Sequence, residues 1–162
     1  SPDVMLRWGG MIALVVVVLD QASKVWAEAA LAYGRPVEVL GWFNLTLVYN
    51  RGAAFSFLSQ AGGWQRGFFI VIGLIAVAIL LGWLRRLPPR ERWQGLGLAL
   101  ILGGAVGNLI DRARHGYVVD FIDWHYGGWH WPTFNLADSA ITAGVVLLLL
   151  TLVCGNMRGG TR

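Results

Sequence analysis

Two aspartates, Asp120 and Asp138, are the residues best suited to chemistry in an otherwise apolar chain. Asp120 lies in the stretch GYVVDFIDW, and Asp138 lies at the start of the apolar run TFNLADSAITAGVVLLLLTLVC. A charge near hydrocarbon is costly, so such carboxylates are functional candidates. Two close carboxylates in a low-dielectric site share one proton and supply both an acid and a base near neutral pH. Such a pair could activate water and protonate a leaving amine.

The same two residues also have a structural interpretation. Asp138 or Asn135 could cap the last helix, and Asp120 could pair with an arginine. Spacing alone favours this interpretation, because two separated aspartates form no specific motif. If the two carboxylates do meet, we expect Asp138 to ionise more readily, since the start of a helix favours an anion.

Other polar side chains lie near the ends of apolar runs. Asp20 precedes Lys24 by four residues, the favourable order for an ion pair along a helix, so a structural pair is the preferred interpretation. Asn108 and Arg112 carry donors that could hold the backbone of an extended peptide. The alternative for this region, plausible for Asp111, is a solvated and paired helix end.

A zinc site is a further alternative. Four possible ligands fall within one segment: Asp120, Asp123, His125 and His130. The sequence lacks an H-E-x-x-H helix, so we favour a site without metal and expect no cofactor. A dyad of Ser23 and Lys24 is disfavoured, because neighbouring side chains on a helix point about 100° apart.

The composition indicates an integral membrane protein. Of 162 residues, 56% are hydrophobic and 14% are charged, whereas soluble domains carry about 25% charged residues. Nine tryptophans suit the aromatic belts of membrane interfaces. The net charge of +4 comes without a basic patch interleaved with aromatic residues, so we expect no nucleic-acid partner. The single cysteine, Cys154, excludes an internal disulfide.

Four apolar segments are long enough to cross a bilayer as helices: residues 6–26, 67–84, 95–111 and 137–154. The loop RRLPPRER between the second and third segments carries four arginines, and such a short basic loop should be cytoplasmic. Four spans then place both termini in the cytoplasm. This topology gathers five aspartates at the outer side: Asp20, Asp111, Asp120, Asp123 and Asp138.

The outer segments are residues 27–63 and 112–136. The first contains FNLTLVYN, whose period-two alternation predicts a strand. Gly52, followed by Ala53 and Ala54, keeps the chain slim where another backbone approaches. The second is rich in Trp, Tyr, His and Gly, and we expect it to be amphipathic and to rest on the membrane surface.

A small transporter, or a cation-binding protein with an acidic outer rim, is the alternative to an enzyme. A transporter usually places its ionisable site near the midplane between repeated halves. This sequence shows no internal repeat and has its carboxylates on one side, so transport is disfavoured. A structural membrane protein, whose acidic residues are only caps and ion pairs, is a third hypothesis.

Five motifs spread over nearly the whole chain resemble those of bacterial lipoprotein signal peptidases, the type II signal peptidases. They are DQASK at 20–24, YNRGAAFSFL at 49–58, GGAVGNLIDR at 103–112, VVDFID at 118–123 and FNLADSAI at 134–141. Together and in this order they are highly specific. The resemblance implies an aspartic endopeptidase of the bacterial inner membrane, with its site on the periplasmic side. It would remove the signal peptide from diacylglyceryl-modified prolipoproteins, cutting just before the lipidated cysteine.

The resemblance also implies roles for individual residues. The catalytic aspartates of the family fall on Asp120 and Asp138. Its substrate pocket, which the cyclic peptide globomycin also occupies, falls on four residues: Asn50, Asn108, Arg112 and Asn135. Structural support is expected from Asp20, Lys24, Gly52 and Asp111.

The implied fold is an all-α membrane protein with a small β element. It has four transmembrane helices, a periplasmic β-cradle and an interfacial helix on the membrane surface. We expect residues 1–162 to form a single peptidase domain, surrounded by membrane lipids and working as a monomer without a cofactor.

Overall fold

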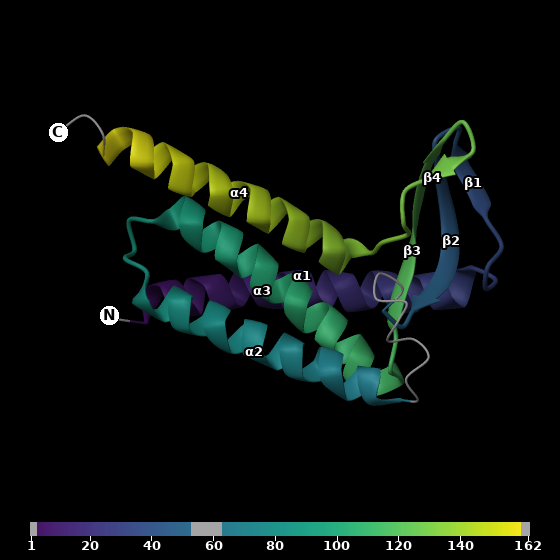
Figure 1. The fold of residues 1–162 in the computed structure, drawn as a ribbon, viewed down its shortest axis with the longest axis horizontal. Helices are drawn as coiled ribbons and strands as arrows, with labels where there is room; N and C mark the ends of the chain where they lie inside the picture. Colours follow the sequence, from purple (N-terminus) through teal and green to yellow (C-terminus); the bar gives the residue numbers. More distant parts are fainter. Residues whose placement is uncertain (1–2, 53–62, 160–162) are drawn as a thin grey trace.

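The structure, a computed structural model, describes residues 3–52 and 63–159, with side chains up to residue 155. Four long helices dominate these residues (Figure 1): α1 (Val4–Ala30), α2 (Trp64–Arg86), α3 (Arg92–His115) and α4 (Leu136–Gly159). Each is long and apolar enough to span a membrane. The four segments expected to cross the bilayer each lie within one of these helices.

Helix α3 packs against each of the other three helices, and its small residues make this possible. A Cβ atom on Gly97 would lie 2.9 Å from the carbonyl oxygen of Gly144. A Cβ atom on Gly104 would collide with the carbonyl oxygen of Ala137. The backbones of α3 and α4 therefore touch directly, as small residues allow at interfaces of membrane helices. This close approach brings the start of α4 against the C-terminal half of α3.

The hydrophobic core of the bundle lies towards the end that contains the start of α1 and the link between α2 and α3. It is formed by buried residues of α1, α2 and α3, and of the link between α2 and α3: Met5, Ala13, Leu80, Leu84, Leu87, Leu98 and Leu102. Elsewhere large apolar side chains point outwards, among them Leu14, Val18, Ile75 and Ile79, each more than half exposed. An outer surface of this kind suits contact with lipid tails.

A four-stranded antiparallel sheet crosses the end of the bundle opposite the start of α1 and the end of α4 (Figure 1). Its strands, in spatial order, are β1 (Val37–Leu40), β2 (Phe43–Asn50), β3 (Val118–Tyr126) and β4 (Trp129–His130). The predicted strand in FNLTLVYN is β2. The expected membrane fold with a small β element is confirmed.

The segment 112–136 differs from its expectation. It forms the last turn of α3, then β3 and β4, and then the start of α4. Residues 118–124 pair with β2 in the register Val48↔Asp120 and Asn50↔Val118, so this part of the segment is a strand of the sheet. The helices of residues 3–52 and 63–159 are the four already named, so the implied surface helix is not among the described elements.

Candidate active site

The two carboxylates singled out by the sequence lie close together, joined by two asparagine side chains. Asn135 Nδ2 donates to Asp120 Oδ1 at 2.8 Å, and Asn108 Nδ2 donates to Asp138 Oδ1 at 2.9 Å. Asn135 Nδ2 also donates to Asn108 Oδ1 at 3.1 Å, which closes the chain of contacts. Asp120 comes from β3, Asn108 from α3, and Asp138 from the first turn of α4. Three different elements therefore converge on one site.

The start of α4 is held by the same residues. Asn135, just before the helix, accepts a hydrogen bond from the Asp138 backbone N–H through Oδ1 at 2.9 Å. Its own backbone N–H donates to Asp138 Oδ2 at 3.2 Å. This is a capping box with Asp in place of Glu. Asp138 therefore has both of the predicted roles. Its Oδ2 takes part in the helix cap, and its Oδ1 accepts the hydrogen bond from Asn108 in the polar site.

Asp120 is almost completely buried, with 1% of its surface exposed. Burial raises the pKa of Asp120 to about 7, and the nearby negative charge of Asp138 adds to the effect. Hydrogen bonds from Asn50 and Asn135 oppose part of the rise. Asn50 reaches this position from the end of β2, the strand paired with β3. The site therefore contains a carboxyl group that can hold a proton near neutral pH.

Arg112 lies in the last turn of α3, beside the carboxylates. Its guanidinium lies 4.6 Å from the centre of the Phe69 ring, and it interacts electrostatically with Asp120 and Asp138. The end of α3 is held in turn by Arg66, whose Nε donates to the carbonyl oxygen of Arg112 at 2.9 Å. A half-buried cation is thus placed at the edge of the acidic pair.

A buried ion cluster lies directly behind the site. Lys24 Nζ is 2.8 Å from Asp20 Oδ2, 2.9 Å from Asp111 Oδ2 and 3.1 Å from Asn108 Oδ1. Asp20 and Asp111 each also accept one backbone N–H, from Ala137 and Val119 respectively, at 3.0 Å. Ala137 precedes Asp138 and Val119 precedes Asp120, so the cluster holds the backbone next to both carboxylates.

This cluster corrects one interpretation and adds one residue. The structural alternative for Asp111 was a solvated and paired helix end. Asp111 is paired, but only 2% of its surface is exposed, so the prediction that it is solvated is wrong. Gln21 was missed. Its Nε2 donates to Asp111 Oδ1 and to the carbonyl oxygen of Gly107, both at 3.1 Å. Its position between Asp20 and Lys24 in DQASK was the available signal.

Comparison with known proteins shows the family of this chain. The model of the signal peptidase (SPase) II family matches residues 12–154. The chain belongs to the signal peptidase II family. It is therefore a peptidase and, with four helices able to span a membrane, a multi-pass bacterial membrane protein. The transporter alternative is not favoured.

Three similar proteins are named lipoprotein signal peptidase. The one from Paraburkholderia phytofirmans is 53% identical over 143 residues, 88% of this chain and 82% of that protein. The one from Burkholderia thailandensis is 53% identical over 149 residues, 92% of this chain and 89% of that protein. The one from Hydrogenovibrio crunogenus is 49% identical over 140 residues, 86% and 81% of the two chains.

Two solved structures, both described as bacterial membrane enzymes, share the fold. One has a TM-score of 0.84 at 32% identity and covers 96% of this chain and 93% of its own. The other has a TM-score of 0.80 at 34% identity, with coverages of 90% and 92%. This chain therefore shares its overall architecture with two solved bacterial membrane enzymes.

Gly52 follows the site residue Asn50 and needs to be glycine for two reasons. Its φ angle is +104°, a region that other residues rarely adopt. A Cβ atom there would also lie 2.6 Å from Phe69 Cε2, under the ring on which Arg112 rests. Gly52 thus lets the chain pass close to the Phe69 ring; the expected neighbour was another backbone, and the observed one is a side chain. Ala53 and Ala54, which were part of the same expectation, lie outside the described residues.

The residues weighed as zinc ligands do not converge. Asp123 is bound by His130 Nδ1 at 2.8 Å and by Thr46 Oγ1 at 3.1 Å. His125 stacks on His130 with ring centres 5.1 Å apart. Asp120 is instead held by the asparagines of the acidic site. Within residues 3–52 and 63–159, no three His, Cys, Asp or Glu side chains are grouped to hold a metal ion.

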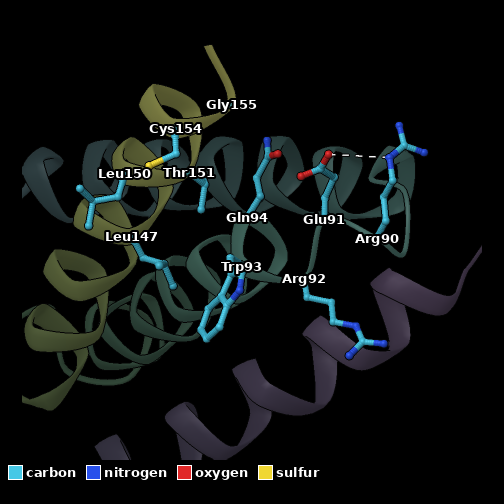
Figure 2. A pocket seen from close by; sticks show the side chains of 10 residues that line it. All are labelled: Arg90, Glu91, Arg92, Trp93, Gln94, Leu147, Leu150, Thr151, Cys154 and Gly155. Carbon is cyan, nitrogen blue, oxygen red and sulfur yellow. Dashed lines mark ion pairs between the residues drawn. The ribbon is translucent and has the colours of Figure 1, made fainter. Parts of the chain in front are cut away.

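A separate hollow of about 500 Å³ lies at the end of the helix bundle opposite the acidic pair, between the start of α3 and the end of α4 (Figure 2). Trp93 and Arg90 line it from one side, and Leu147, Leu150 and Cys154 from the other. None of the expected site residues contributes to it. The acidic pair and this hollow are therefore distinct features at the two ends of the bundle.

Proposed function

We propose that this peptidase removes the signal peptide from diacylglyceryl-modified prolipoproteins, cutting just before the lipidated cysteine. The single observation that carries the proposal is the joining of Asp120 and Asp138 through the amides of Asn108 and Asn135. Lipoprotein signal peptidases at 49–53% identity support the choice of substrate.

Asp120 and Asp138 are the catalytic residues in this proposal, and Asp120 carries the shared proton. Ionised Asp138 takes a proton from water as the water oxygen attacks the scissile carbonyl carbon. Asp120 donates its proton to the carbonyl oxygen, which gives a neutral tetrahedral intermediate. The intermediate then collapses: the C–N bond breaks, the nitrogen receives a proton from Asp138, and Asp120 recovers its proton from the hydroxyl group that becomes the new carboxyl. No metal or organic cofactor is needed for these transfers.

Four residues around the pair hold the substrate backbone in this proposal: Asn50, Asn108, Arg112 and Asn135. Arg112 carries five N–H donors and no acceptor, which suits carbonyl oxygens of an extended peptide. Asn108 already uses one amide hydrogen on Asp138, and Asn135 Nδ2 donates to Asp120, Asn108 and the Val119 carbonyl, so both amides set the geometry of the pair as well. Globomycin, a cyclic peptide, would compete for the same donors.

The remaining site residues act as support, and the whole is one peptidase domain. Asp20, Lys24 and Asp111 hold the backbone on either side of the pair, and Gly52 allows the close passage of β2. We place the sheet and the acidic pair on the periplasmic side of the inner membrane. The basic loop between α2 and α3 lies at the other end of the bundle, so both termini are then cytoplasmic. The protein is a monomer surrounded by membrane lipids.

A gel-shift cleavage assay with purified protein in detergent tests the proposal. The substrate is a diacylglyceryl-modified prolipoprotein, and each reaction is run with and without a metal chelator. Asp120→Asn and Asp138→Asn should each lower the cleavage rate by at least about 100-fold, the scale of a lost general acid or base. Asp123→Asn is the matched control, since Asp123 is also a buried aspartate of β3 but lies outside the pair.

Chelator-resistant cleavage by the wild type and by Asp123→Asn, with loss in the two other variants, is the expected result. Absence of cleavage by folded wild-type protein would refute the assignment of substrate. Loss of cleavage on chelation would refute the metal-free mechanism.

A further inference from the structure

A groove of about 610 Å³ is lined by Asp138 of the candidate catalytic pair and by the next turn of α4. Asp138 lines one end of the groove. One wall is the end of the sheet together with residues 131–134, and the other wall is the first turns of α4. Figure 1 shows this end of the sheet reaching sideways past the start of α4, away from α2. The groove therefore opens next to the outer surface of the bundle.

The sheet-side wall is aromatic and rigidly held. Trp124, Trp131 and Phe134 line it, and the Trp124 and Phe134 rings meet edge to face with centres 4.9 Å apart. Phe134 is fixed by backbone hydrogen bonds of 3.0 and 2.9 Å with Ile122, and the Trp131 N–H donates to the Trp124 carbonyl at 2.8 Å. Even so, Trp124 is 48% and Trp131 53% exposed. These large apolar rings thus remain exposed and are not packed into a core.

The helix wall is formed by small side chains: Ser139, Thr142 and Ala143. Below them the same face of α4 continues as exposed apolar residues: Val146, Leu150 and Val153, each more than half exposed. At about 1.5 Å per residue, the ten residues from Ala143 to Val153 span about 15 Å, half the thickness of a bilayer core. The groove therefore leads into an apolar track about one leaflet deep.

We propose that this groove holds the diacylglyceryl group of the substrate cysteine, with its acyl chains lying along the α4 track. The inference rests on the proposed function. The scissile bond directly precedes the lipidated cysteine, so its lipid must leave the site only a few covalent bonds from Asp138. The groove is the apolar space that begins at that carboxylate. The hydroxyls of Ser139 and Thr142 lie where the glycerol esters would pass.

An extended peptide fits this groove poorly. Every buried backbone N–H and C=O of a peptide needs a partner, and the rings of the aromatic wall offer only the indole N–H groups of Trp124 and Trp131. Acyl chains need no hydrogen bonds and gain from leaving water. The chemistry of the two walls therefore favours lipid in this groove, and leaves the peptide to Arg112 and the asparagines on the other side of the pair.

Steady-state cleavage of two synthetic substrates, which share one peptide but carry long or short acyl chains, tests the inference. Ala143→Trp fills the groove, and Trp131→Ala removes part of the opposite wall. Both should raise KM for the long-chain substrate about tenfold, the effect of losing contacts with about two CH₂ groups. Both should also reduce the preference for long chains, with kcat within about twofold of wild type because the acidic pair is intact. Val145→Trp, at the same depth on another face of α4, is the matched control and should behave as wild type.

The outcomes separate the inference from the function on which it rests. If wild type cleaves both substrates and both groove variants keep its KM values and chain-length preference, the groove assignment is overturned and the peptidase assignment stands. An equal rise of KM for long and short chains would also overturn it, since a groove for acyl chains must discriminate between them. If wild type cleaves neither substrate, the proposed function fails first.

Discussion

At the scale of single residues, the two aspartates differ in their surroundings, and this difference separates their roles. Asp120 is buried on β3 and accepts hydrogen bonds from Asn50 and Asn135. Asp138 is half-buried at a helix start and accepts the Asn135 backbone N–H at 3.2 Å. A buried site favours the neutral form of a carboxyl group, and a helix N-terminus favours the charged form. These surroundings support our proposal that Asp120 carries the shared proton.

The rate of cleavage should therefore depend on pH around the pKa of Asp120. Burial and Asp138 raise the pKa of Asp120 to about 7, so this group holds its proton below that pH and loses it above. Because the proposed mechanism needs protonated Asp120, kcat/KM should fall about tenfold per unit as pH rises well above 7. Rates measured from pH 5 to 9 with the lipid-modified substrate give the profile.

The control for this profile is Asp123→Asn, which should show the same fall at high pH, because Asp123 does not contact the pair. A rate that stays constant between pH 6 and 9 would contradict the assignment of the proton to Asp120. The direction of the pH effect tests whether the active pair holds one proton, since a pair that is active only when both carboxylates are ionised would give a rate that rises with pH.

At the scale of secondary-structure elements, the ion cluster connects α1, α3, β3 and α4. Lys24 neutralises Asp20 and Asp111, and each of these acids also binds a backbone N–H beside a catalytic candidate. Removal of one partner from a buried ion pair leaves a charge without compensation. The cluster therefore links the stability of the fold to the geometry of the site.

Lys24→Met should lower the free energy of unfolding by about 3–5 kcal/mol, because it leaves two buried carboxylates without their cation. Thermal unfolding of purified protein in detergent measures the change as a lower Tm. The control is Arg85→Met, whose partner Asp3 lies 3.8 Å away in a pair that is largely exposed. Exposed pairs contribute little, so Arg85→Met should leave Tm nearly unchanged. Equal Tm values for Lys24→Met and wild type would contradict the supporting role of the cluster.

The contact between α3 and α4 is the other element that sets the site. Gly104 lies against the carbonyl oxygen of Ala137, so no side chain separates the two helices at this level. Asn108, one turn further along α3, then reaches Asp138 with its amide at 2.9 Å. The small residues in GGAVGN therefore allow the two helices to pack closely, which brings Asn108 of α3 to the start of α4.

At the scale of the whole molecule, the polar site and the basic loop lie at opposite ends of the bundle. The sheet, Asp120 and Asp138 are at one end, and the link between α2 and α3 with its arginines is at the other (Figure 1). A peptidase acting on a lipid-anchored substrate needs both water and the bilayer. A site at the outer edge of the bundle, next to a groove that opens towards lipid, meets both needs.

Thiol labelling tests the predicted orientation. In a Cys154→Ala background, a cysteine at Tyr126, which is 84% exposed in the sheet, should react with a membrane-impermeant maleimide in intact spheroplasts. A cysteine at Arg90 should react only after the membrane is permeabilised, because the basic loop is cytoplasmic. The reverse pattern would contradict the periplasmic placement of the site. Labelling of both positions in detergent controls for thiol access.

Much of the fold could be predicted because its signals are local. Each of the four apolar segments lies within one observed helix, and the period-two alternation in FNLTLVYN located β2. The strand β3 was missed, since VVDFIDW lacks clean alternation and its first four residues are all buried. Its structure depends on pairing with β2, a partner about seventy residues earlier in the chain.

The sequence by itself determined the class of protein, the spans and the residue types of the site, because hydropathy, periodicity and motifs depend on near neighbours in the chain. Only the tertiary structure decided that Asp120 and Asp138 meet, that Asp111 is buried against Lys24, and that Gln21 joins the cluster. These contacts arise where β3 pairs with β2 and where α3 touches α4. Such distances are set by the packing of whole elements, which no local stretch of sequence specifies.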